Sequence, residues 1–308
     1  MTLAIVLVVI AQFLNAVVAL VDKYVVSSRR VPNPSYYAFF ISVLSSLSVF
    51  IFLFSSVPIP IDGLTVPTFN NIAFPTLPVA LLSFAAGGAF FFALWTLFSA
   101  LRATDASDVV PVVGAVSALA AFPLGYLIFG SRLSQNFLIG IFLLIVGTLL
   151  LSHFRFRRKI LFVTILSGLF FALHFIGLKY LFGITHFDNA FFWSRMGIVL
   201  AALVIFLPRW EFCKNCARST SLGSTLLILG NKMLAGLASI MILKAIDLSE
   251  VSLVQALGGL QFVFLLGISV TVGHFLPKEC GENLVGRNKM HKVIAVSVIV
   301  AGFFFLFL

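Results

Sequence analysis

The chain has 308 residues, of which 61% are hydrophobic and 10% are charged. Soluble domains contain about 45–50% apolar and about 25% charged residues, so this composition excludes a water-soluble globular fold. Ten membrane-spanning helices of about 20 residues would use about 200 residues, which leaves no stretch for a separate catalytic domain. The net charge of +10 comes from Lys and Arg in short loops between apolar runs, which is typical of cytoplasmic loops and not of a nucleic-acid-binding surface.

Apolar runs bounded by charged residues, Gly or Pro predict ten membrane-spanning helices. The first run lacks the basic start and the cleavage site of a secretory signal, so it is predicted to be a retained helix. The Pro-rich stretch at 56–78 is predicted to be an extended loop outside the membrane. The ten helices are expected near residues 3–23, 36–57, 78–101, 108–129, 136–153, 160–182, 189–208, 223–243, 250–273 and 291–308.

The basic residues segregate between the two sets of predicted loops. Of the 20 Lys and Arg residues, 15 lie in the odd-numbered loops and three, Arg132, Lys179 and Lys244, lie in the even-numbered loops. Arg195 and Lys232 lie inside predicted helices. Because positive charge accumulates in cytoplasmic loops, this split supports ten helices and places both termini outside the cytoplasm. We therefore expect a multi-pass protein of the cell (inner) membrane.

An internal repeat supports the same count. When Arg102–Gly125 is aligned on Lys244–Gly267, a shift of 142 residues, eight of the 24 positions are identical, among them Asp105 with Asp247. Outside that block, Lys23-Tyr24 matches Lys179-Tyr180.

The repeat divides the chain into two predicted domains of five helices, residues 1–153 and 154–308. An odd number of helices in each half means that the halves lie in the membrane with opposite orientations. Such inverted repeats are common in secondary transporters, where the substrate site lies at the midplane between the halves. The predicted fold is therefore an all-α polytopic membrane protein built of two inverted five-helix repeats.

The block ALRATDASDVVPVVGAVSALAAFPLGYLIFGSRLSQNFLIGIFLLIVGTLLL, residues 100–151, resembles the last three helices of an EamA-type half in the drug/metabolite transporter superfamily. The second half, from ILKAIDLSEV onward, repeats the pattern more loosely. The chain departs from the family pattern at Ser131, where a Glu often follows the fourth-helix Gly, and its first helix lacks the usual Trp-Gly. The resemblance implies a basket of ten helices, made of two EamA-like repeats, that exports or exchanges small solutes.

Lys232 is the most informative single residue. It lies about nine residues, or about 13 Å, from one end of the predicted helix 223–243. A charge near the bilayer centre costs at least about 2.5–3.5 kcal/mol, so such residues usually face a cavity and a partner. The alternative is a misplaced helix boundary, with the side chain reaching the interface. Arg195 either reaches the headgroups or faces inward, where its planar fork suits a carboxylate or phosphate.

Six uncharged polar residues complete the predicted substrate site. Each either binds substrate or forms a structural hydrogen bond between helices. Asn231 lies about 100° around the helix from Lys232, so one of the two is expected to line the cavity while the other packs against a neighbour. A histidine inside a helix could carry protons, or could be buried and neutral. These residues are Asn231, His174, Gln255, Gln261, Asn15 and Gln12.

No cofactor or metal is expected. Cys213 and Cys216 have metal-ligand spacing, but they supply one pair where structural zinc needs four ligands. The nucleotide-binding signature GxxxxGK[ST] is absent, so ATP is not expected to drive the protein directly. The sequence also lacks paired histidines, HExxH and a pair of carboxylates inside the helices, which argues against an enzyme.

The predicted function is secondary transport of a small anionic or zwitterionic metabolite, such as an amino acid or a phosphorylated metabolite, by alternating access. The preference for negative charge rests on the expectation that every acidic residue lies in a loop or at a helix end, leaving no carboxylate to pair with Lys232 or Arg195. A lipid or glycolipid flippase with the same architecture is the main alternative, followed by an intramembrane enzyme and a scaffold. The expected partners are the substrate and the bilayer, without nucleic acid, and no oligomeric state is predicted.

Overall fold

The computed structural model describes residues 2–27, 33–55, 66–104, 106–130, 135–151, 158–206 and 222–272, together with 294–295, 297–299, 301–302 and 305. Over these residues the chain is helical and contains no strand. Cys213, Cys216 and Cys280 lie outside them, as does most of the predicted tenth helix.

Within the described residues, seven helical segments are long and apolar enough to cross a membrane, as expected of a multi-pass membrane protein. The α-helices are α1 (Thr2–Ser27), α2 (Pro34–Leu44), α3 (Leu77–Ala103), α4 (Ala106–Phe129), α5 (Gln135–Leu151), α6 (Arg158–Ile184), α7 (Phe187–Phe206), α9 (Leu222–Leu248), α10 (Val251–Ala256) and α11 (Leu260–Val272). The 3₁₀ segments are η1 (Ser45–Phe54), η2 (Phe69–Asn71) and η4 (Leu257–Gly259).

Two predicted helices differ from the simple expectation of one uninterrupted α-helix. The predicted helix 36–57 changes from α2 to the 3₁₀ segment η1 at Ser45, where three serine hydroxyls donate to carbonyls three residues back. Such local bonds compete with the regular α-helical pattern. The predicted helix 250–273 is divided into α10, η4 and α11, with the 3₁₀ turn at Gly258 and Gly259.

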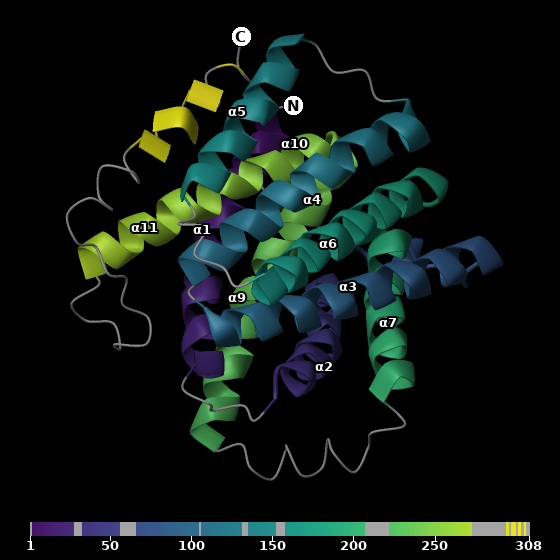
Figure 1. Ribbon diagram of the computed structural model, residues 1–308. Coiled ribbons are helices and arrows are strands. Elements are labelled where there is room, and N and C mark those ends of the chain that lie inside the picture. Colours follow the sequence, from purple (N-terminus) through teal and green to yellow (C-terminus); the bar gives the residue numbers. More distant parts are fainter. Residues whose placement is uncertain are drawn as a thin grey trace.

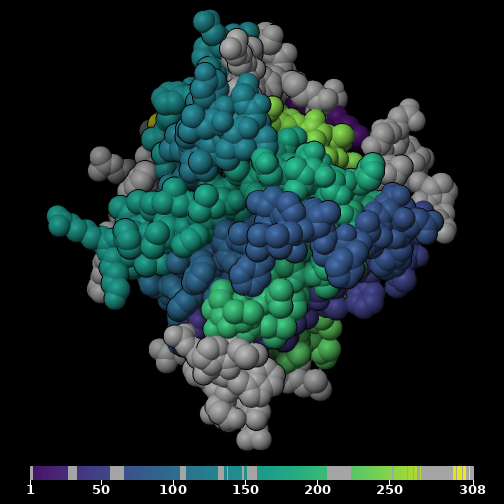
Figure 2. Space-filling view, turned by 90° about the vertical axis from the view of Figure 1, so that its right-hand side faces the viewer, coloured from purple at the N-terminus to yellow at the C-terminus, as the bar shows by residue number. Residues whose placement is uncertain are grey.

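The helices pack into one bundle in which segments of the two sequence halves alternate. Helix α6 lies between α3 and α4, while α7 packs on the other side of α3 (Figure 1). On the surface shown in Figure 2, α3 in blue separates α6 from the brighter green α7. Helix α1 packs against α9 and α11. The largest contacts of α1 and α3 are therefore with helices of the second half.

The crossing of α3 and α7 is a backbone-to-backbone contact made possible by two glycines. A Cβ on Gly87 would lie 2.5 Å from the carbonyl oxygen of Gly197, and a Cβ on Gly197 would overlap the backbone of Ser83. Gly87 and Gly197 thus permit close packing of α3 against α7. Gly88 differs, because no atom lies within 4 Å of the position of its Cβ.

Gly87→Ala is therefore expected to lower the stability of the protein by about 1–3 kcal/mol, because the two helices must separate to admit the methyl group. The neighbouring variant Gly88→Ala is the control. It adds the same methyl group in open space and should be neutral or slightly stabilising, since Ala favours helix over Gly. Thermal unfolding of the purified variants in detergent measures both, and equal effects would contradict the close crossing.

Two lysines at matching positions of the sequence repeat cap two helix C-termini. Lys23 donates to the carbonyl oxygens of Leu101 (3.2 Å) and Thr104 (2.8 Å) at the end of α3. Lys179 donates to those of Ile246 (2.7 Å), Asp247 and Ser249 (both 3.0 Å) at the end of α9. A cation is favourable at a helix C-terminus, where carbonyls lack partners within the helix. Each lysine ties the first helix of its half to the end of the third.

The described part of the 56–78 loop is held on the N-terminus of α7. The carboxylate of Asp188 accepts hydrogen bonds from the Thr68 amide (3.1 Å) and the Asn71 side chain (2.7 Å). The Trp193 indole donates to the carbonyl of Ala73 at 2.9 Å. The position of Asp188 in the first turn of α7 is favourable because an acid there complements the helix dipole. The three hydrogen bonds hold the loop that leads into α3 against α7.

Candidate functional site

A cavity of about 280 Å³ lies where the two halves meet. Its walls come from α1, α2, α3 and α4 of the first half and from α6, α9, α10, η4 and α11 of the second half. The polar side chains that line it are Gln12, Asn15, Asp22, Ser117, Lys232, Ser239, Gln255 and Gln261.

The cavity-lining face of α1 follows the helical period. Gln12, Asn15, Ala19 and Asp22 all line the cavity, at intervals of three, four and three residues. This spacing places side chains on one face of an α-helix. Asp22 therefore lies on the same face as the two carboxamides.

The facing helix α9 shows the same spacing. Lys232, Ala235, Ser239 and Ile242 line the cavity at intervals of three, four and three residues. Because α1 and α9 pack against each other, their two cavity-lining faces lie side by side. Asp22 is the charged residue on the cavity-lining face of α1, and Lys232 is the charged residue on that of α9.

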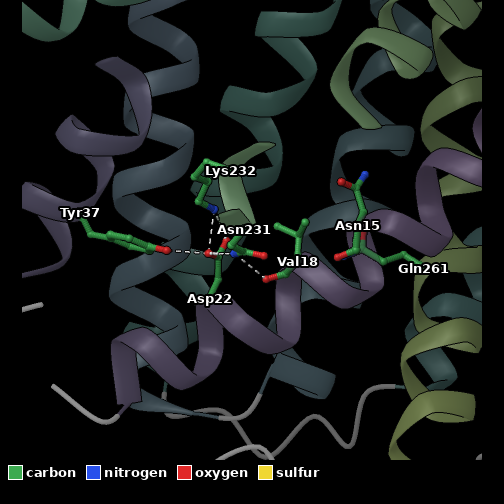
Figure 3. A network of polar contacts seen from close by, with 7 residues as sticks. All are labelled: Asn15, Val18, Asp22, Tyr37, Asn231, Lys232 and Gln261. Atoms are coloured by element: carbon green, nitrogen blue, oxygen red, sulfur yellow. Dashed lines mark hydrogen bonds and ion pairs between the residues drawn. The ribbon is translucent and has the colours of Figure 1, made fainter. Parts of the chain in front are cut away.

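Asp22 is the centre of a buried network that joins α1, α2 and α9 (Figure 3). The Lys232 ammonium lies 2.7 Å from each carboxylate oxygen of Asp22. Oδ1 also accepts hydrogen bonds from the Tyr37 hydroxyl at 2.6 Å and from the Asn231 side-chain amide at 2.8 Å. The exposed fractions of the Lys232 and Asp22 side chains are 7% and 10%. The pair links the first half of the chain to the second.

This network overturns one expectation from the sequence. Asp22 was expected at the end of a helix near residue 23, but α1 continues to Ser27 and the carboxylate is buried. Lys232 is therefore paired, and the prediction that no carboxylate lies at its depth is wrong. The physical reason is that the helix can include both Asp22 and Lys23. The Lys23 ammonium is hydrogen-bonded to carbonyl oxygens at the end of α3, and Asp22 is paired with Lys232.

Asn231 and Lys232 divide their roles as the helical geometry predicts. Lys232 lines the cavity, whereas Asn231 is buried against α1, where its amide also donates to the carbonyl of Val18 at 3.3 Å. The carbonyl oxygen of the Asn231 side chain, Oδ1, is buried and has no hydrogen-bond partner. A buried acceptor without a partner lowers the stability of the protein, and it marks a place where a donor can bind.

Arg195 does not line the cavity itself. Its guanidinium donates through Nη2 to the Ser239 hydroxyl at 2.8 Å, and Ser239 does line the cavity. The guanidinium also lies 5.0 Å from the centre of the Phe191 ring, within range of a cation–π interaction. It is buried, its Nε has no partner, and among the described residues no carboxylate pairs with it. Arg195 thus orients Ser239 and carries a positive charge behind the cavity wall.

Four of the five predicted carboxamides, Gln12, Asn15, Gln255 and Gln261, lie on the cavity wall, and Asn231 is the exception. Asn15 donates to Gln12 at 3.3 Å, and Gln261 donates to the backbone carbonyl of Asn15 at 3.1 Å, away from the Asp22 network (Figure 3). The side-chain oxygen of Gln255 accepts from Ser117 at 3.1 Å, joining α10 to α4. Each carboxamide has more hydrogen-bonding groups than these bonds use, so the wall can still bind polar parts of a ligand.

His174 is not among the residues that line the cavity. Its Nδ1 lies 2.9 Å from the carbonyl oxygen of Ala86, and the centre of its ring lies 4.8 Å from that of Phe90 and 5.1 Å from that of Phe175. The side chain is buried. This is the geometry of a structural bond between α6 and α3, the simpler of the two interpretations open from the sequence.

The remainder of the cavity wall is apolar and partly aromatic. Phe90 and Phe98 come from α3, and Phe171 and Phe175 come from α6. Among the described residues, no group of three or more His, Cys, Asp or Glu side chains could hold a metal ion. The site therefore combines an ion pair, a set of carboxamides and an aromatic wall, which suits a small molecule with polar and apolar parts.

No family model matches the chain, and no curated protein matches it. Among the solved structures, 27 chains match. One of them, described only as a crystal structure of a protein, covers 98% of this chain and 96% of its own length with a TM-score of 0.66 and 17% sequence identity. At this identity the likeness shows a shared fold over the whole chain.

Proposed function

We propose that the protein is a ten-helix secondary transporter of the EamA type, built of two inverted five-helix repeats, that moves a small solute by alternating access. The observation that carries the proposal is the cavity between the two halves, whose polar groups lie on helices of both halves. A rocking motion of the halves would open such a cavity to either side of the membrane in turn. The proposed location is the cell (inner) membrane, with both termini outside the cytoplasm.

The lysine caps support the inverted repeat. Thr104 and Ile246 are related by the same shift of 142 residues that aligns the repeated block, and each accepts a hydrogen bond from the lysine of a Lys-Tyr pair. The contact partners of the halves also correspond, because α3 packs on α6 and α9 packs on α1. Two halves that repeat a sequence block, a cap and a helix contact fit duplication of one five-helix unit.

The charge of the site supports an anionic or zwitterionic solute. Among the described side chains that line the cavity or bond to a lining side chain, two are cations, Lys232 and Arg195, and one is an anion, Asp22. This leaves one positive charge in excess in a medium where charges are weakly screened. A solute with a carboxylate or phosphate, such as an amino acid or a phosphorylated metabolite, would balance it.

A thermal-shift screen of the purified protein tests this function. Amino acids, organic carboxylates and phosphorylated metabolites are expected to raise the unfolding temperature, because a ligand that binds the folded state stabilises it. The compounds that do so should then enter proteoliposomes that contain the protein. Stabilisation by quaternary ammonium compounds alone would contradict the proposed charge of the solute, and stabilisation by lipids alone would favour a flippase.

A further inference from the structure

We propose that Asp22 couples solute binding to proton binding: protonation of its carboxylate releases the Lys232 ammonium into the cavity, where it binds the carboxylate or phosphate of the solute. This inference rests on the proposed function and names the coupling ion of the same site. The proton comes from solution and bonds to a carboxylate oxygen of Asp22. Each anionic group of the solute therefore enters the site together with one proton.

The ion pair in the structure keeps Lys232 from serving an anion. Its ammonium lies 2.7 Å from both oxygens of Asp22, so its strongest hydrogen bonds and its charge are already used. An anion that approached Lys232 would also meet the carboxylate, since both groups line the cavity. Binding of an anion by Lys232 therefore requires that the negative charge of Asp22 be removed.

The neighbours of Asp22 can accommodate its neutral form. The Tyr37 hydroxyl and the Asn231 carboxamide donate to the carboxylate, but each also carries an acceptor. Asn231 Oδ1 is buried without a partner, and a half turn of the amide brings it to face Asp22, where it can accept the new O–H. An ammonium has three donors and no acceptor. Protonation therefore ends the ion pair with Lys232, while Asn231 exchanges its amide bonds to Asp22 and Val18 for a bond accepted from the new O–H.

Few other charges act on Asp22. Of the described helices that pack on α1, α9 contributes Lys232, and α3 carries only Arg102, which is exposed at its end. Helix α11 and η4 carry no titratable residue, and Tyr37 is the group on α2 that contacts Asp22. Asp108 of α4 lies outside the described side chains, and Lys23 next to Asp22 points to the end of α3. Lys232 and the proton are thus the competing cations at this carboxylate.

The released ammonium of Lys232 can move into the cavity. Lys232 lies at one end of the cavity-lining face of α9, and Ala235 and Ser239 follow on the same face. The flexible four-carbon stem lets the ammonium swing toward the cavity centre. Because protonation favours anion binding, anion binding must favour protonation by the same factor. Net uptake of one proton for each anion bound follows from this linkage.

The first test measures the release of Lys232 without any ligand. Asp22→Asn mimics the neutral side chain, so amine labelling of the purified variant at a mildly alkaline pH should modify Lys232 several-fold faster than in the parent. Peptide mass spectrometry reads the site, and Lys179, held by three carbonyls, is the internal control. Unchanged labelling of Lys232 in a variant that still unfolds in one cooperative transition overturns the inference. Tyr37→Phe, which keeps both charges, serves as the matched variant and should label as the parent does.

The second test uses benzoate, a small aromatic carboxylate that suits the apolar wall, with neutral benzamide as its control. In the parent, the apparent affinity for benzoate should rise by up to about tenfold for each pH unit of acidification, as expected when one proton binds with each anion. In Asp22→Asn the affinity should be high and independent of pH. Equal affinity of the parent at every pH overturns the coupling, as does a failure of Asp22→Asn to bind benzoate. The transport screen of the parent decides the proposed function separately, since it does not depend on either result.

Discussion

Asp22→Ala is expected to destabilise the protein by about 3–5 kcal/mol, the usual cost of removing one partner of a buried ion pair. The substitution leaves the Lys232 ammonium in the cavity wall without its counter-ion, and it removes the acceptor of Tyr37 and Asn231. The loss follows from the desolvation of a charge that no other described carboxylate balances. Thermal unfolding of the purified variant in detergent measures it.

The ion pair at the end of α9 provides a matched control. Asp247 pairs with Lys244 at 2.8 Å, but both side chains are more exposed, at 24% and 17%. Asp247→Ala should cost less than about 1 kcal/mol, because such pairs are weak near water. The double variant Asp22→Ala/Lys232→Met should be more stable than Asp22→Ala, since it no longer buries an unpaired charge. A double variant as unstable as Asp22→Ala would contradict the origin of the effect in an unpaired charge.

Lys232→Met is expected to impair ligand binding in a protein that still folds, at a smaller cost in stability than Asp22→Ala. Methionine keeps much of the bulk of the lysine stem, and Asp22 retains the hydrogen bonds from Tyr37 and Asn231. We expect the ligands that stabilise the parent to bind at least about tenfold more weakly, a loss of about 1.4 kcal/mol or more. The measurement is the ligand concentration that gives half of the maximal thermal shift.

Lys244→Met is the control for this second effect. It removes a lysine from the same helix, but Lys244 does not line the cavity and instead pairs with Asp247 and lies over the Phe187 ring. Its ligand affinity should equal that of the parent. If Lys232→Met folds and binds ligands as tightly as Lys244→Met does, Lys232 has no part in the site.

The sequence predicts most of the described helices because length and apolarity decide whether a segment can cross a bilayer. The predicted helices 78–101, 160–182 and 189–208 correspond to α3, α6 and α7 within a few residues. The predicted helix 108–129 is also a single helix, α4, although it contains Pro111 and Pro123. Pro111 is buried among neighbouring helices, whereas Pro123 lies on the exposed face of α4.

The interruption of the predicted helix 250–273 is harder to foresee. The apolar run continues without a charge, and composition alone does not distinguish one α-helix from α10 and α11 joined by η4. The Gly258-Gly259 pair is the local signal, because glycines permit a change of helical type at low cost. The break positions Gln255 and Gln261 on the cavity wall from two short segments.

Lys232 could be located from the sequence because a charge in the middle of an apolar run has few explanations. Asp22 could not be located by the same rule, because it precedes Lys23 near the end of its run. A signal was nevertheless present, since Asp22 lies at helical spacing from Gln12 and Asn15, and that spacing places the carboxylate on the polar face of α1. Whether a charged residue such as Asp22 is buried in the bundle is therefore better predicted from the polar face of its helix than from a neighbouring charge at the end of the apolar run.

The contact between Arg195 and Ser239 has no sequence signal. Serine is common in helices, and the two residues come from helices that approach each other only in the folded bundle. The planar fork of Arg195 predicts a bidentate anionic partner, but the guanidinium here binds a hydroxyl and an aromatic ring. Tertiary packing thus determines whether this cation contacts the solute or acts through Ser239.

Access of the cavity to both sides of the membrane tests the central claim most directly. A single cysteine at Ala235, which lines the cavity, is compared with one at Ala238, which is fully buried on the same helix, with Cys213, Cys216 and Cys280 replaced by serine. We predict that an impermeant thiol reagent modifies Ala235→Cys in right-side-out and in inside-out vesicles, and modifies Ala238→Cys in neither. Modification of Ala235→Cys from one side only, in a protein that folds and inserts normally, would contradict alternating access.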